Sequence, residues 1–183
     1  LIDKTLVIWT SDNGAVQRNP PQGSNAPYRG WGYDTSEGAM RMPCVMRWPG
    51  VIPAGRVQDE LCSSLDLLPT LARLAGASLP ARTIDGHDIR PLLFAEAGVK
   101  SPWDAKGFGY YRLEQLQAIR AGEWKLYLPL PNKFTTLARK TAPAQLELYD
   151  VRRDASEERE VSAQHPDVVN RLLALADGIR ADL

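Results

Sequence analysis

Two adjacent side chains that could bind a hard cation stand just after an apolar run near the start of the chain. The run is "TLVIWT", Thr5 to Thr10, and Asp12 and Asn13 follow it in "SDNG". A carboxylate and an amide carbonyl are oxygen ligands that Ca²⁺ and Mg²⁺ accept. Neighbouring residues of a strand point to opposite faces, so one site can use both only if the chain bends, which Gly14 permits. Asp-Asn-Gly is also ordinary turn chemistry, so a plain turn is the alternative interpretation.

A buried strand is the element expected to position this pair. The continuous apolar and β-branched run predicts a strand covered on both faces in a parallel sheet, and ligand sites in such sheets lie beyond the carboxyl ends of the strands. "MPCVMRW", Met42 to Trp48, predicts a second buried strand. The loop between the two runs is long and rich in Pro, Gly, Asn and Ser, and long loops without periodicity are often functional.

The later part of the chain predicts a different architecture. A short helix is expected from Leu67, with Asp66 as its N-cap. "LQAIRAGEWKLYLPL" predicts two strands and "LELYDV" a third, while Pro166 opens a helix with one apolar stripe. An α/β fold is therefore expected, with a core portion at residues 1–104 and a small α+β subdomain at 105–183, an antiparallel sheet under a C-terminal helix.

Composition excludes several partner classes. Lys plus Arg and Asp plus Glu number 22 each, so no net charge favours nucleic acid or an anionic membrane surface. No apolar run reaches the roughly 20 residues of a membrane span. The two cysteines make no disulfide framework, and each is expected to be a small buried apolar residue.

Several blocks of the sequence occur in the order of a known family. They are "SDNG", "YRGWGYDTSEGAMRMPCVMRWPGVIPAG", "SSLDLLPTLARLAG", "DGHDIRPLL", "AIRAGEWKLYL" and "ELYDVRRD". Together they resemble the C-terminal half of a type I sulfatase, the arylsulfatase family of the alkaline phosphatase superfamily. The resemblance implies the C-terminal part of an alkaline-phosphatase-like α/β sandwich followed by a smaller domain.

The resemblance also implies a calcium site and a missing nucleophile. In the family the Asp and Asn of the motif are calcium ligands, a role it assigns here to Asp12 and Asn13. The family nucleophile is a formylglycine made in a C/S-x-P/A-S-R motif, but "VMRW" follows Cys44 and "SSLD" follows Cys62. We therefore assign no catalytic residue and expect formylglycine only in the full-length protein. Two further acidic calcium ligands are also absent, so the isolated chain is expected to bind calcium poorly and to be inactive.

One position departs from the family pattern inside the matched region. The family commonly has R-G-G-K-G-T-T-x-E-G-G, in which the lysine donates a hydrogen bond to the sulfate. Gly32 stands at that lysine position. Arg29 and Tyr33 lie close by in sequence, and our hypothesis is that they bind the substrate instead, because an arginine fork suits an oxyanion. The alternative is structural: Arg29 pairs with a carboxylate such as Glu37, and Tyr33 packs on the loop.

The expected function is that of a sulfatase fragment with a sulfate ester as substrate. A phosphate or phosphonate ester hydrolase of the same superfamily is one alternative, and a non-catalytic relative that binds sulfated glycans is the other. A periplasmic or secreted location is implied by the resemblance alone.

Overall fold

The structure, a computed structural model, describes residues 1–129 and 145–182 and divides into two compact units. Their segments are Leu1–Trp9 with Val45–Ala105, and Thr10–Cys44 with Lys106–Leu183. Each unit is thus built from two separate stretches of chain. Asp12 and Asn13 belong to the second unit, which also holds the C-terminal sheet.

Short helices and a pair of strands make up the first unit and its edges. The elements are η1 (Ile2–Lys4), β1 (Val7–Thr10), β2 (Cys44–Arg47), η2 (Ser64–Asp66), α2 (Leu67–Leu74), α3 (Arg90–Leu93) and α4 (Trp103–Lys106). The predicted helix is α2, and Asp66 stands at its N-cap position, but the Asp66 side chain makes no capping hydrogen bond to the helix. The Asp66 carboxylate is fully buried and accepts hydrogen bonds from the Ser63 and His87 backbone N–H groups and from the Trp103 indole, at 2.7, 2.8 and 2.9 Å.

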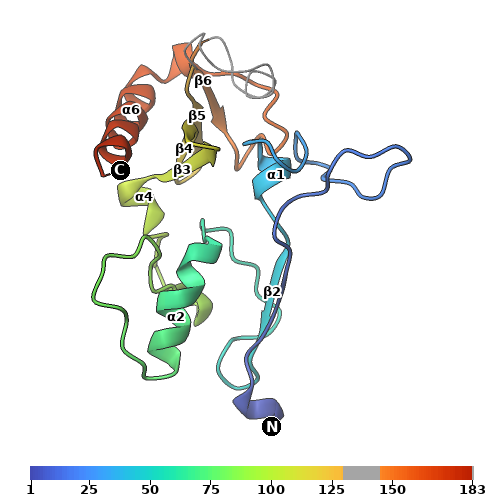
Figure 1. Ribbon diagram of the computed structural model, residues 1–183, viewed down its shortest axis with the longest axis vertical. Coiled ribbons are helices and arrows are strands. Elements are labelled where there is room, and N and C mark those ends of the chain that lie inside the picture. The colour runs from blue at the N-terminus through green and yellow to red at the C-terminus, as the bar shows by residue number, and fades with distance from the viewer. Residues whose placement is uncertain (130–144, 183) are drawn as a thin grey trace. The chain divides into compact units, whose positions relative to one another are not determined.

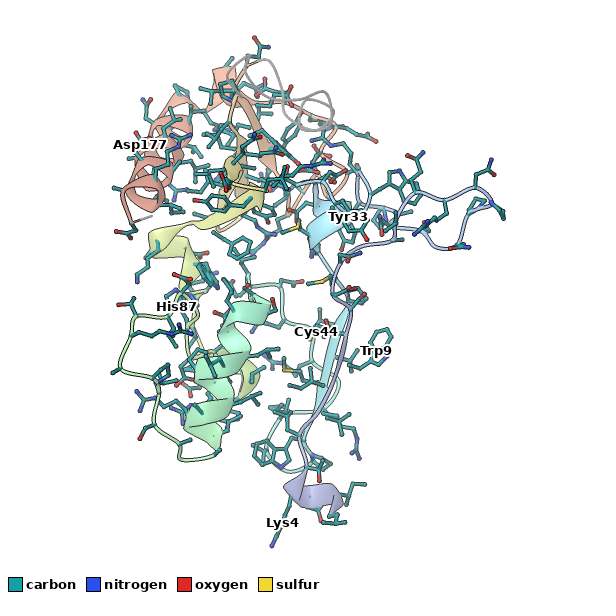
Figure 2. All side chains as sticks on the ribbon, viewed as in Figure 1. Lys4, Trp9, Tyr33, Cys44, His87 and Asp177 are labelled. Atoms are coloured by element: carbon teal, nitrogen blue, oxygen red, sulfur yellow. The ribbon has the colours of Figure 1, made fainter. Side chains whose placement is uncertain are left out.

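The two strands are present, but the prediction that they are buried is wrong for this chain. β1 and β2 form a two-stranded sheet (Figure 1), and Val7, Trp9 and Val45 are 49%, 62% and 59% exposed. Figure 2 shows the Trp9 side chain projecting away from its strand. Among the described residues no further strand pairs with these two. Cys44 and Cys62 are also exposed, again contrary to expectation.

An antiparallel sheet forms the centre of the second unit. Its strands are β3 (Phe108–Arg112), β4 (Gln115–Ala121), β5 (Trp124–Tyr127) and β6 (Glu147–Asp150), in that order. The three predicted strands correspond to β4, β5 and β6, although Leu130, at the end of the run that predicts β5, lies outside the described residues. The sequence interpretation missed β3, which pairs with β4 through a register shift between Tyr110 and Tyr111.

The two faces of this sheet bury different kinds of side chain. The C-terminal helix α6 (Pro166–Ala181) covers one face, as predicted (Figure 1), and Leu126, Leu148 and Leu172 belong to the fully buried apolar core between them. The opposite face carries Tyr110, Tyr127, Tyr149, Arg120 and Lys125, which share a side because Arg120 pairs with Lys125 and Lys125 with Tyr149. That second face meets α1 (Glu37–Met40), a one-turn helix of the segment after the long loop.

The predicted division into a core portion at 1–104 and a subdomain at 105–183 stays a prediction. In this chain the two units meet at Ala105 and Lys106, and the segment 10–44 groups with the C-terminal sheet. Hydrogen bonds and ion pairs between α1 and the sheet account for that grouping.

Candidate functional site

The "SDNG" turn directly follows β1 and is closed by short hydrogen bonds. The Asn13 backbone N–H donates to Asp12 Oδ1 at 2.9 Å, and the Ser11 hydroxyl donates to the Asn13 carbonyl at 3.1 Å. Asn13 Nδ2 donates to the Gly14 carbonyl at 2.8 Å, so Oδ1 is the Asn13 side-chain atom suited to a cation. Asp12 is exposed and Asn13 is half-buried. The turn chemistry and the two cation-binding oxygens therefore coexist.

Gly14 fixes this turn against α1. Its N–H donates to the Ala39 carbonyl at 2.8 Å, and a Cβ on Gly14 would lie 1.8 Å from the Gly38 carbonyl oxygen. No side chain fits in that space, so the two backbones touch only because residue 14 is glycine. Because Gly14 directly follows Asn13, its contact with α1 also fixes the position of Asn13.

Gly32, at the position of the family lysine, lies beside the same turn. Its N–H donates to the Ala15 carbonyl at 2.8 Å. A Cβ on Gly32 would lie 2.6 Å from the Gly14 carbonyl oxygen and 3.1 Å from Asn13 Nδ2. The loop therefore brings residue 32 next to Asn13. Any side chain larger than that of glycine at this position would require the neighbouring backbone to shift.

Arg29 is held by the C-terminal sheet. Its Nε lies 3.5 Å from Glu157 Oε2, and its guanidinium stands 5.3 and 5.1 Å from the ring centres of Tyr127 and Tyr149. The carboxylate partner is thus Glu157 rather than the Glu37 of the structural alternative. The Arg29 side chain is 41% exposed, so part of it still faces solvent.

Tyr33 has a different environment on the same loop, which precedes α1 in Figure 2. It is 68% exposed and has a φ of 77°, a left-handed conformation that is rare for a tyrosine. The next residue, Asp34, accepts from the backbone N–H groups of Ser36 and Trp31 at 2.8 and 3.1 Å, which fixes the turn. The Tyr33 side chain is thus mostly exposed, on a turn whose backbone is fixed by Asp34.

A largely buried group of charged side chains joins α1 to the sheet, and the sequence interpretation missed it. We call it the charge cluster; its members are Glu37, Glu157, Arg29, Arg120 and Lys125. Lys125 Nζ lies 3.0 Å from a Glu37 oxygen and 3.2 Å from a Glu157 oxygen, and Arg120 Nη1 lies 3.0 Å from the other Glu37 oxygen. The signal available in the sequence was a lysine inside the apolar run "WKLYL", which a solvated strand face also explains.

Two tyrosine hydroxyls complete the charge cluster, and the charges within it keep Glu37 and Lys125 ionised. Tyr110 donates to Glu37 at 3.1 Å, and Tyr127 donates to Glu157 at 2.6 Å. Burial raises the pKa of Glu37, but the Lys125 and Arg120 charges outweigh burial and hold that pKa below its ordinary value. Burial lowers the pKa of Lys125, but Glu37, Tyr110 and Glu157 together outweigh burial and raise that pKa above its ordinary value. Both groups are therefore charged at neutral pH.

The described residues supply only part of a metal shell. They contain no group of three or more His, Cys, Asp or Glu side chains that could hold a metal ion. Asp12 and Asn13 contribute one carboxylate and one carbonyl, whereas Ca²⁺ takes six to eight oxygens. The oxygens of this pair would fit one edge of a calcium shell, and a full shell would need further ligands.

Each of the two histidines contacts a tryptophan ring. His87 stands edge-on to Trp103 with ring centres 4.6 Å apart, and His165, just before α6, lies tilted against Trp124 with ring centres 4.7 Å apart. Within the described parts of the chain, no helix is both long enough and apolar enough to cross a membrane.

Comparisons with known proteins identify the relatives of this chain. Residues 31–176 match the family model described as N-sulphoglucosamine sulphohydrolase, C-terminal. Steryl-sulfatase of Mus musculus is 36% identical and is matched over 100% of this chain and 34% of its own length; arylsulfatase A of Homo sapiens is 42% identical over 69% of this chain and 25% of its own. The crystal structure of the PsFucS1 sulfatase from Pseudoalteromonas sp. superposes with a TM-score of 0.82 at 25% identity, over 98% of this chain and 37% of that one. The chain thus spans about a third of the length of such relatives.

Proposed function

Since the chain belongs to the sulfatase family, we propose that the full-length protein hydrolyses sulfuric esters and that this chain is its C-terminal portion. The observation that carries the proposal is the position of "SDNG": it follows β1 directly and is fixed by α1 beside the residue 32 loop. Similarity along the whole chain to steryl-sulfatase supports the same activity.

Asp12 and Asn13 are proposed to hold one side of a calcium ion through a carboxylate and a carbonyl oxygen. Calcium, when bound, supplies positive charge that stabilises the negative charge of a sulfate group and of the nucleophile. The nucleophile, a formylglycine, is proposed to come from outside this chain, because neither cysteine lies in the required motif. The isolated chain is accordingly proposed to be inactive.

Arg29 and Tyr33 are proposed to bind the ester, replacing the cation absent at Gly32. Arg29 is anchored by Glu157 yet remains 41% exposed, and Tyr33 is exposed on the loop that contacts the "SDNG" turn. An anchored guanidinium and an exposed phenol can both donate hydrogen bonds to sulfate oxygens. A site outside the cytoplasm, periplasmic or secreted, is proposed on family resemblance alone.

The glycine at position 32 is the observation that favours a second candidate. A cation aimed at a sulfate stabilises charge that develops during the reaction, and its loss weakens that effect. A phosphate or phosphonate ester hydrolase of the same superfamily, or a non-catalytic protein that binds sulfated glycans, would tolerate this change. The upstream reading frame separates the glycan binder from the enzymes, because only enzymes need the C/S-x-P/A-S-R motif.

Activity of the full-length protein tests the proposal. We expect hydrolysis of p-nitrophenyl sulfate that exceeds hydrolysis of p-nitrophenyl phosphate, is lost after calcium is removed with a chelator, and returns on calcium addition. Asp12→Ala should abolish this activity while the circular dichroism spectrum is unchanged, since an exposed ligand is removed. A preference for the phosphate ester would overturn the sulfatase proposal, and full activity of Asp12→Ala would show that the motif is only a turn.

A further inference from the structure

Lys125 is the centre of the charge cluster. It is fully buried, and it contacts both carboxylates, Glu37 at 3.0 Å and Glu157 at 3.2 Å. Its ammonium also stands 4.2 Å from the ring centre of Tyr110 and 4.9 Å from that of Tyr127. A buried ammonium is stable only where its surroundings compensate the lost hydration, and two carboxylates and two rings do so here.

A short chain of contacts leads from Lys125 to the "SDNG" turn. Glu37 opens α1, and its own N–H donates to Glu157 at 3.1 Å, so α1 is held by side chain and backbone together. The next two residues of α1 contact the turn: Gly14 donates to the Ala39 carbonyl and leaves no space for a Cβ before Gly38. Asn13 is the neighbour of Gly14 in sequence.

We propose that Lys125 is a positioning residue for calcium binding. By holding Glu37 it fixes α1, and through α1 it fixes Asp12 and Asn13 at the end of β1. This inference rests on the proposed calcium role of that pair. Without the Lys125 ammonium, the carboxylates of Glu37 and Glu157 would face each other between α1 and the sheet. Their repulsion would move α1 away from the sheet.

Calcium affinity of the full-length protein provides the test. The apoprotein, prepared with a chelator, is titrated with calcium chloride in a calorimeter, and kcat/KM on p-nitrophenyl sulfate is measured against calcium concentration. We expect Lys125→Met to weaken calcium binding by about tenfold or more, a loss typical of residues that orient metal ligands. Saturating calcium should restore much of kcat/KM, because the ligands themselves are intact.

Leu126 provides the matched control on the same strand. It is fully buried on the opposite face of β5, in the core beneath α6. Leu126→Ala should lower Tm because it leaves a cavity, yet it should leave the Kd for calcium unchanged. A role of Lys125 in stability alone would make both variants behave alike.

A double-mutant cycle tests whether Lys125 acts through Glu37. Glu37→Gln, Lys125→Met and the double variant should weaken calcium binding to similar extents, because each breaks the same connection. Tyr110→Phe removes only the hydroxyl that donates to Glu37, so it should weaken calcium binding severalfold and serves if Lys125→Met fails to fold.

The outcomes separate the inference from the proposed function. A wild-type Kd for calcium in folded Lys125→Met or, where that variant does not fold, in Tyr110→Phe would overturn the positioning role while leaving the sulfatase proposal intact. Equal weakening in Leu126→Ala would also overturn it. A wild-type protein that binds no calcium would instead overturn the proposed function itself.

Discussion

Arg29 and Tyr33 differ in how much their present contacts explain. The Arg29 guanidinium is engaged by one carboxylate and two aromatic rings, whereas the Tyr33 side chain is mostly exposed in a left-handed backbone conformation. Left-handed non-glycine residues outside the Asn and Asp class cluster at functional sites, where the surrounding structure holds them. Tyr33 is therefore the stronger of the two candidates for contact with an ester.

Substitutions at these two residues test substrate binding at the residue scale. In the full-length enzyme we expect Arg29→Ala and Tyr33→Phe each to lower kcat/KM on a sulfate ester, Arg29→Ala by about tenfold or more, because a donor to the sulfate is lost. Arg153→Ala is the control, since Arg153 is 89% exposed and pairs only loosely with Asp150 at 3.7 Å. Steady-state kinetics that are unchanged for Arg29→Ala would leave Arg29 a structural partner of Glu157.

Asp66 shows how a single buried carboxylate organises the elements of the first unit. Its three partners come from the turn before η2, from the His87 loop and from α4. A Cβ on Gly86 would lie 2.0 Å from the Leu65 carbonyl oxygen, so the His87 loop passes directly against η2. The sequence interpretation found Asp66 as a helix cap but not these long-range bonds, which depend on tertiary contacts.

Removal of the Asp66 carboxylate should destabilise these elements together. We expect Asp66→Ala to lower the free energy of unfolding by about 3 kcal/mol or more, because three buried or partly buried donors lose a charged acceptor. Asp85→Ala, at an exposed aspartate of the same loop, should change it by less than about 0.5 kcal/mol. Urea denaturation measures both. Similar losses for the two variants would show that the Asp66 hydrogen bonds add little.

The elements that the sequence predicted share a strong local pattern. The apolar stripe of α6 and the alternating runs of β4 and β5 follow their own periodicity, so neighbouring residues suffice to predict them. β3 has no such alternation in "FGYYR", and the charge cluster requires residue 37 to meet residues 120 and 125, which no local pattern encodes. The calcium pair came from motif resemblance, and its contact with α1 came only from the structure.

At the scale of the whole molecule, apolar side chains at the surface are concentrated in one unit. In the first unit the large apolar side chains that are most exposed include Val7, Trp9, Val45, Val57, Leu65 and Leu68. They fall on β1, on β2, before α2 and within it, so the elements that looked most buried from sequence are the least covered. The sheet of the second unit, by contrast, has a cluster of buried side chains on each face.

Acid stability of the whole molecule should depend on Glu37. Because its pKa is depressed in the folded state, the folded state binds fewer protons than the unfolded one near that pKa. The stabilisation is present above the ordinary pKa of 4.5 and is lost as pH falls from there through the folded value. Between about pH 6 and pH 3, the Tm should thus fall less steeply with decreasing pH for Glu37→Gln than for the wild type. Parallel curves would contradict this assignment.

The grouping of segment 10–44 with the C-terminal sheet has a consequence for exchange between relatives. A chimera that took only residues 106–183 from another sulfatase would replace Lys125, Arg120 and Glu157 while keeping Glu37, and the charges would match only if both parents shared the arrangement. The loop that bears Asp12 and Asn13 and the sheet that supports this loop should therefore be exchanged together, although the 61 residues from Val45 to Ala105 separate them in the sequence. Recombination that respects this grouping must carry both segments together.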